Sequence, residues 1–208
     1  MSFPIHPLDK ALGDISSIRR QVARTTEFHG YGAATLAATG IFAMLAAVAQ
    51  GFLVPDPANH IGIYLRIWYA TAIVSATLIG MQTLARTRRI HSGLADEMIL
   101  MAVEQFLPSV GAGALLSIVL VRFVPGSVWM LPGLWQITFS LGVFASCRFL
   151  PRPMAAAGVW YLLTGLTCIG LGDTRALTPW TMGTAYGIGQ LLVAAVLLWG
   201  SKEDANES

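Results

Sequence analysis

Residues 178–199 read TPWTMGTAYGIGQLLVAAVLLW, an apolar run whose length decides the class of fold. A helix needs roughly 20 apolar residues to cross the hydrocarbon core of a bilayer. The last part of the run, LLVAAVLLW at 191–199, does not alternate apolar and polar residues as the strands of a membrane β-barrel do. The run is therefore typical of a transmembrane helix.

Five further runs of the same kind precede this one, at residues 33–54, 62–85, 98–121, 128–147 and 154–172. The chain of 208 residues is 55% hydrophobic and only 12% charged, which is too apolar for an ordinary soluble domain. The sequence predicts an all-α polytopic membrane protein, a bundle of six transmembrane helices in a lipid bilayer.

The chain before the first run predicts a short amphipathic helix. Apolar residues recur there at spacings of three and four, at Leu12, Ile15, Ile18 and Val22, with arginines beside them. Such a helix lies in the headgroup layer or binds a partner. We predict three parts: a cytoplasmic segment 1–30 with this helix, a transmembrane domain 31–200 and a cytoplasmic tail 201–208.

The basic residues are divided unequally between alternate connections. Ten lie on the side of the termini, namely Lys10, Arg19, Arg20, Arg24, Arg86, Arg88, Arg89, Arg148, Arg152 and Lys202. Three lie on the other side: Arg66, Arg122 and Arg175. Cytoplasmic loops are the ones enriched in Lys and Arg, so both termini are predicted to be cytoplasmic. Because topology accounts for the charges, no nucleic acid partner is predicted.

Polar side chains inside the runs are the candidate functional residues: Glu104, Arg66, Gln105, Gln136 and Gln190. An ionisable residue inside a membrane is a functional candidate by default. Glu104 is either interfacial or structurally paired, or it couples protons or ions, and Arg66 can extend to the surface. The glutamines either bond helix to helix or line a polar path.

Small residues at four-residue spacing predict where helices pack. Gly113, Gly183 and Gly187 are the predicted packing positions, the last two between the fifth and sixth runs. The stretch GTAYGIG at 183–189 could instead form a homodimer face. Aromatic residues, including Tyr64, Trp68, Trp135, Trp160, Tyr161 and Trp180, predict an interfacial belt or, alternatively, an aromatic-lined ligand site.

No catalytic, cofactor-binding or metal-binding residue is predicted. The four histidines lie outside or at the edges of the runs, and the sequence contains no HExxH, CxxC, GxSxG or Walker motif.

Four stretches carry a family resemblance: DISSIRRQVART (14–25), GYGAATLAATG (30–40), PGLW (132–135) and TPWTMGTAYGIGQLL (178–192). Their layout resembles uncharacterised six-helix bacterial inner-membrane proteins. The resemblance implies a multi-pass protein of the bacterial cytoplasmic (inner) membrane and carries over no functional residues.

The favoured function is that of a non-enzymatic integral membrane protein: a regulatory, sensory or accessory subunit of a membrane assembly. Its partner would be another membrane protein or a second copy in a homo-oligomer. The alternative is a small-solute transporter or channel. A third and less favoured hypothesis is a lipid-modifying enzyme that uses His91, Asp96 and Glu97.

Reporter fusions test the predicted orientation. A reporter active only in the cytoplasm should work after Ser208 or within residues 86–93 and fail at Asn59, because the basic residues favour the termini side. A cytoplasmic signal from Asn59 would reverse the topology.

Overall fold

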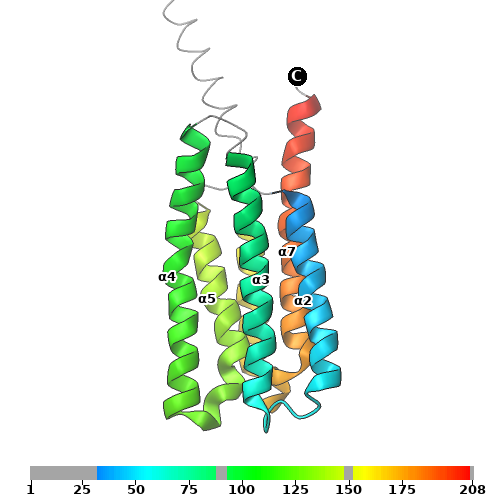
Figure 1. Ribbon diagram of the computed structural model, residues 1–208, viewed down its shortest axis with the longest axis vertical. Helices are drawn as coiled ribbons and strands as arrows, with labels where there is room; N and C mark the ends of the chain where they lie inside the picture. The colour runs from blue at the N-terminus through cyan, green and yellow to red at the C-terminus, as the bar shows by residue number, and fades with distance from the viewer. Residues whose placement is uncertain (1–31, 88–92, 148–151, 207–208) are drawn as a thin grey trace, which may run out of the picture.

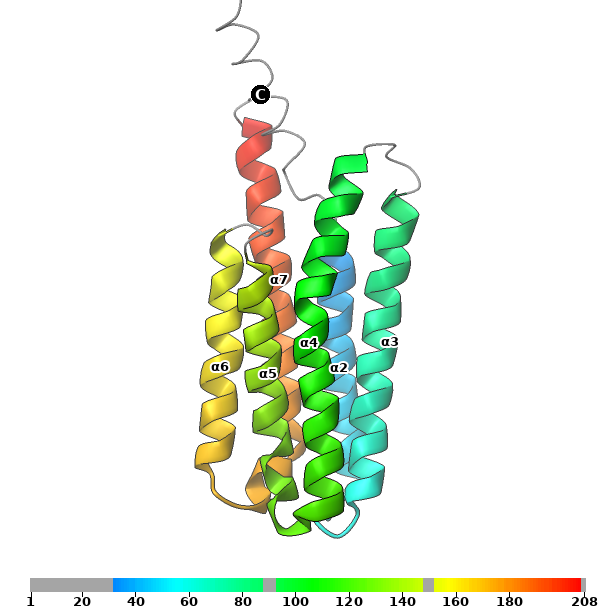
Figure 2. The ribbon, with the colours of Figure 1, turned by 90° about the vertical axis from the view of Figure 1, so that its left-hand side faces the viewer.

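The computed structural model describes residues 32–87, 93–147 and 152–206, and every regular element in these residues is helical. The α-helices are α2 (Ala33–Leu53), α3 (Ile61–Thr87), α4 (Gly93–Phe123), α5 (Leu131–Ser146), α6 (Ala155–Gly170) and α7 (Pro179–Asn206). Figure 1 labels all of them except α6, which is labelled in Figure 2. The predicted amphipathic helix lies outside the described residues.

Five of these helical segments are long and apolar enough to cross a membrane: α2, α3, α4, α7, and α5 together with the 3-10 helix η1 (Pro125–Met130). The all-α class predicted from the sequence is therefore confirmed for the described residues, and by length and composition five of the helical segments fit the predicted lipid environment. The helix α6 has only 16 residues, fewer than the predicted run 154–172. It follows the 3-10 helix η2 (Arg152–Met154), which contains Pro153, and the chain turns after it at Gly172, whose φ is 72°.

The helices run alternately up and down along one axis. Three connections meet at one end of the bundle: residues 54–60, the η1 segment, and residues 171–178 with the 3-10 helix η3 (Thr174–Leu177). We call this the short-loop end. The C-terminus lies at the opposite end, where α7 extends beyond its neighbours (Figure 2).

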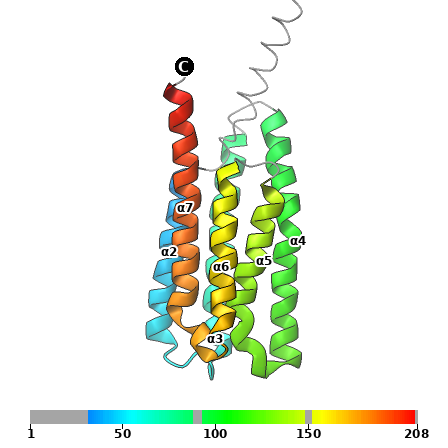
Figure 3. The same ribbon diagram turned by 180° about the vertical axis from the view of Figure 1, so that it is seen from behind.

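Lateral packing places α3 and α4 at the two ends of a series. α3 packs on α2, α2 on α7, α7 on α6, α6 on α5, and α5 on α4 (Figures 2 and 3). α3 and α4 follow each other in the chain but do not pack closely on each other. Each of these two helices therefore leaves most of its circumference outside the bundle.

Glycines bring α2 and α7 into backbone contact. A Cβ added to Gly40 would lie 2.9 Å from the carbonyl oxygen of Gly187, and one added to Gly187 would lie 2.7 Å from Met44 Sδ. A Cβ at Gly183 would lie 2.5 Å from the Cβ of Ala47. Small residues are favoured at such contacts because dispersion, not hydrophobicity, drives helix association in lipid.

This contact corrects two expectations about residues 183–189. Gly183 and Gly187 face α2 rather than the fifth run, and it is Gly189 that meets Tyr161 of α6. Because Gly183 and Gly187 are buried within one chain, they are not free to form a homodimer face. The periodicity identified a close-packed face correctly but carried no information about which helix covers it.

A second backbone contact joins α5 and α6. A Cβ on Gly133 would lie 2.7 Å from the carbonyl oxygen of Gly165, and one on Gly165 would lie 2.8 Å from that of Gly133. On the other side of α5, a Cβ at Gly113 of α4 would lie 3.4 Å from Thr138 Oγ1, an ordinary packing distance. Gly113 thus lies in the α4 and α5 interface.

A leucine at Gly187 should disrupt the bundle, because its side chain has no room between α2 and α7. We expect a loss of roughly 1–3 kcal/mol or more in the free energy of unfolding, measured in lipid-detergent micelles. The matched control is Gly80→Leu in α3, where a Cβ would meet nothing within 4 Å. Similar losses in the two variants would show that the Gly187 contact is not tight.

Candidate functional site

Buried polar side chains gather between the middle of the bundle and the short-loop end. We call five of them the interior cluster: Gln50, Tyr64, Gln136, Ser140 and Tyr161. Each is 0% exposed. They come from α2, α3, α5 and α6, so the cluster exists only when these helices have packed together.

Gln50 joins three separate segments. It lies in the last turn of α2, where its Nε2 donates to the carbonyl oxygen of Leu177 in η3 at 2.8 Å. Its Oε1 accepts a hydrogen bond of 2.7 Å from the indole N–H of Trp68 in α3. The amide therefore uses both of its ends, as a buried polar group must to offset its loss of water.

Gln136 connects α5 to the start of α7. Its Nε2 donates to the carbonyl oxygen of Thr181 at 3.1 Å and lies 3.8 Å from Met182 Sδ. This agrees with the interpretation of the in-span glutamines as bonds between helices. Its Oε1 has no partner among the described residues.

Two further tryptophans donate across helix interfaces. The indole N–H of Trp135 donates to Ser117 Oγ at 2.8 Å, which joins α5 to α4. That of Trp160 donates to the carbonyl oxygen of Ala185 at 2.9 Å, which joins α6 to α7. Indole nitrogens inside the bundle thus act as interhelical donors.

The prediction of an interfacial belt is wrong for three of its aromatic residues, because Tyr64, Trp68 and Tyr161 are buried. Trp180 is 53% exposed and agrees with the belt. Helical spacing placed these residues near the ends of the runs, but it did not reveal which of them face inward.

The aromatic rings beside the polar groups form two contact groups, one around Trp135 and one around Phe139. Tyr64 stacks on Trp135 with ring centroids 6.5 Å apart and an interplanar angle of 11°. Phe139 lies 4.7 Å from Tyr161, and Tyr161 lies 5.2 Å from Tyr186. The alternative of an aromatic-lined site concerned the outer ends of the second, fourth and sixth runs. The group around Trp135 joins the second and fourth runs, whereas the group around Phe139 includes Tyr161 of the fifth run.

The two charged candidates lie away from this cluster. Glu104 is exposed and, at about 3.6 residues per turn, lies on the face of α4 opposite Gly113, which packs on α5. Arg66 is exposed on the face of α3 opposite Tyr64 and Trp68 by the same spacing. They occupy opposite ends of different helices, so the fold does not bring them together.

The remaining candidates are divided between surface and interface. Gln105 is exposed, whereas Gln190 is partly buried beside Gly40 in the α2 and α7 interface. Ser140 was not among the candidate functional residues, and Tyr64 and Tyr161 were predicted only as members of the interfacial belt or of the aromatic-lined site. Residue type alone did not reveal that these side chains are buried, because serine and tyrosine occur on every face of membrane helices.

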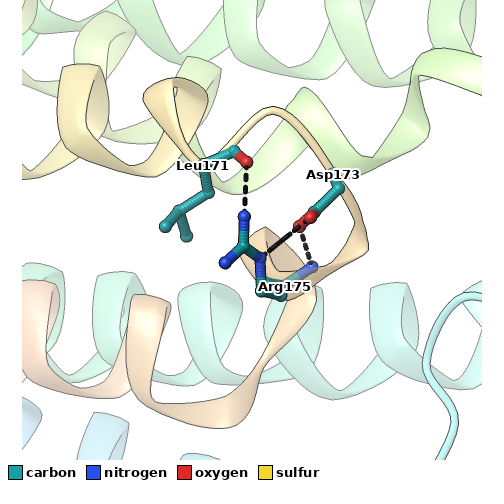
Figure 4. Close-up of polar contacts among 3 residues, drawn as sticks. All are labelled: Leu171, Asp173 and Arg175. Carbon is teal, nitrogen blue, oxygen red and sulfur yellow. Dashed lines mark hydrogen bonds and ion pairs between the residues drawn. The ribbon is translucent and has the colours of Figure 1, made fainter.

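The last loop at the short-loop end is fixed by an exposed ion pair (Figure 4). Arg175 Nε donates to Asp173 Oδ2 at 2.8 Å, and its Nη2 donates to the carbonyl oxygen of Leu171 at 3.1 Å. Asp173 Oδ1 also accepts from the backbone N–H of Arg175. These hydrogen bonds from Arg175 hold the pKa of the Asp173 carboxyl below its ordinary value. The pair orders the turn between α6 and α7.

The interior cluster offers neutral hydrogen-bonding groups between aromatic walls. Hydroxyls can donate and accept, an amide oxygen only accepts, and an indole only donates. Among the described residues, no three His, Cys, Asp or Glu side chains are grouped so that they could hold a metal ion. Comparison of the chain with protein-family models, curated proteins and solved structures finds no match.

Replacing Gln50 should destabilise the bundle. Gln50→Leu leaves the Trp68 indole N–H and the Leu177 carbonyl without their partner, which costs about 1–3 kcal/mol for a buried group. Trp68→Phe removes the same hydrogen bond from the donor side. The loss in the free energy of unfolding of the double variant should therefore be smaller than the sum of the two single losses, by about 0.6 kcal/mol or more. The free energy of unfolding of all three variants is measured in lipid-detergent micelles.

The control for this cycle is Gln105→Leu, the same chemical change at an exposed site. It should leave the free energy of unfolding nearly unchanged. Strict additivity of the Gln50 and Trp68 variants would mean that their hydrogen bond contributes nothing to the folded state.

Proposed function

We propose that the chain is a non-enzymatic membrane component that docks, as a regulatory, sensory or accessory subunit, on another membrane protein through the exposed sides of α3 and α4. We call these two sides the docking face. The proposal rests on how little of α3 and α4 is buried by the other helices of the bundle. Only 11% of the apolar window is buried in α3 and in α4, against 39% in α2 and α7 and 44% in α5.

The docking face includes a polar spot on α4. Glu104 and Gln105 are both exposed at the beginning of the apolar window 103–123. Pro108, also exposed, has no N–H, so the carbonyl of Glu104 lacks its usual helical donor. Acceptors of this kind are costly against lipid and are stabilised when a neighbouring helix supplies donors.

The docking face also has a basic position and small residues on α3. Arg66 points away from the bundle near the short-loop end, and Ala72, Ala76 and Gly80 are exposed along the same helix. A Cβ at Gly80 would meet nothing within 4 Å, so another backbone could approach closely there. A partner helix with an acid opposite Arg66 and donors opposite Glu104 suits this face.

The membrane placement proposed with this function is the bacterial cytoplasmic membrane, with six crossings and both termini in the cytoplasm. The alternation of α5, α6 and α7 supports counting α6 as a crossing, since α5 and α7 both begin at the short-loop end (Figure 3). The distribution of Lys and Arg supports placing the short-loop end outside the cytoplasm.

The alternative function is a small-solute transporter or channel. Coupling through Glu104 would require its carboxylate to face a path inside the bundle, whereas it lies on the side of α4 away from α5. A transport role would therefore depend on the neutral groups of the interior cluster. The exposed position of Glu104 favours the docking proposal.

Photo-crosslinking in native membranes tests the docking face. A photoreactive phenylalanine analogue replaces Ile73 of α3 or Leu107 of α4, which are 64% and 63% exposed. We expect both positions to form a discrete crosslinked band with another protein or with a second copy. The matched controls are Leu163 and Leu166 of α6, at 57% and 52% exposed, which should crosslink to lipid only.

Two outcomes would contradict the proposal. Crosslinks to lipid alone at Ile73 and Leu107 would leave α3 and α4 as lipid-facing helices, and equal protein crosslinking from α6 would show that contact is nonspecific. Mass spectrometry of the band distinguishes a homo-oligomer from a complex with a different protein.

A further inference from the structure

Four buried atoms of the interior cluster have no hydrogen-bond partner among the described residues: Tyr64 Oη, Gln136 Oε1, Ser140 Oγ and Tyr161 Oη. Buried polar groups in proteins are nearly always bonded to protein or to an ordered molecule, and each exception calls for an explanation. All four belong to the interior cluster.

The four atoms belong to residues around two turns of α5. Gln136 and Ser140 are four residues apart and so lie on the same face of that helix. Tyr64 stacks on Trp135, and Tyr161 contacts Phe139, so both phenols come from side chains that touch the same two turns. The four residues therefore border the same two turns of α5.

We propose that these four groups form an interior binding site for a small neutral molecule that both donates and accepts hydrogen bonds. Gln136 Oε1 can only accept, so the bound molecule must donate to it, while the three hydroxyls can take either role. The charged side chains that the structure describes are all exposed, and rings such as Phe139 and Tyr186 line the region. The class that fits is water or a small hydroxylic solute. The inference does not depend on the docking face.

Removing a hydroxyl tests the site, because the direction of the change in Tm shows whether that hydroxyl has a partner. If Tyr161 and Ser140 bond a resident molecule, Tyr161→Phe and Ser140→Ala lose that bond, and each should lower the Tm of the reconstituted full chain by several degrees. If the hydroxyls are truly unpaired, deleting them removes a buried polar group without a partner and should raise the Tm. The control is Tyr69→Phe, at an exposed phenol against Trp135, which should leave the Tm unchanged.

Hydroxyl-radical footprinting in nanodiscs gives a second readout on the unaltered chain. Met182 lies beside Gln136, and Met154 packs among Leu36, Ala194 and Leu197; both methionines are 3% exposed. A resident water should make oxidation of Met182 several-fold faster than that of Met154, because radicals form from that water beside the methionine. A bound hydroxylic solute consumes radicals instead and is detected separately. Denaturing extraction followed by mass spectrometry distinguishes a bound solute from bound water. A bound solute is released in stoichiometric amount, whereas bound water gives no such product.

Two results would overturn the site. One is an unchanged or raised Tm in both Tyr161→Phe and Ser140→Ala. The other is oxidation of Met182 no faster than that of Met154 together with no solute released on denaturing extraction.

Discussion

Close approach of helix backbones at glycine pairs is the constraint on which the rest of this bundle depends. Lipid tails are as apolar as leucine, so burying apolar side chains between helices yields little, and association relies on dispersion and interhelical hydrogen bonds. Gly40 with Gly187, and Gly133 with Gly165, place backbone against backbone in two separate helix pairs. These contacts fix the distance between the paired helices, and this distance allows the interhelical hydrogen bonds to form.

The polar groups of the interior then add specificity to that spacing. Gln50, Trp135 and Trp160 each connect different helices, and Gln50 alone reaches three segments. Dispersion tolerates rotation of a helix about its axis, whereas a hydrogen bond of 2.7–2.9 Å does not. The combination gives one arrangement of α2, α5, α6 and α7. The helix α3 packs mainly on α2 and α4 mainly on α5, and α3 also contacts α5 through the stacking of Tyr64 on Trp135.

Much of the fold could be predicted from the sequence, because the length and apolarity of a membrane helix are local properties. The first run was expected at 33–54 and the helix is Ala33–Leu53, while α6 is shorter than expected because Pro153 and Gly172 bound it. The partner of Gly187 could not be predicted, since periodicity defines a face but not its neighbour. The same limit hid Tyr64, Ser140 and Tyr161, whose burial depends on helices far apart in the chain.

The short α6 has a consequence for the surrounding lipid. At about 1.5 Å per residue its 16 residues extend roughly 24 Å, less than the hydrocarbon thickness of about 30 Å, whereas the 31 residues of α4 extend roughly 46 Å. Under the proposed topology of six crossings, α6 would produce a hydrophobic mismatch on its flank of the bundle. The bilayer would compensate by local thinning, which favours short acyl chains beside α6 and ordinary chains beside α4. The protein would then sort lipids around its own circumference.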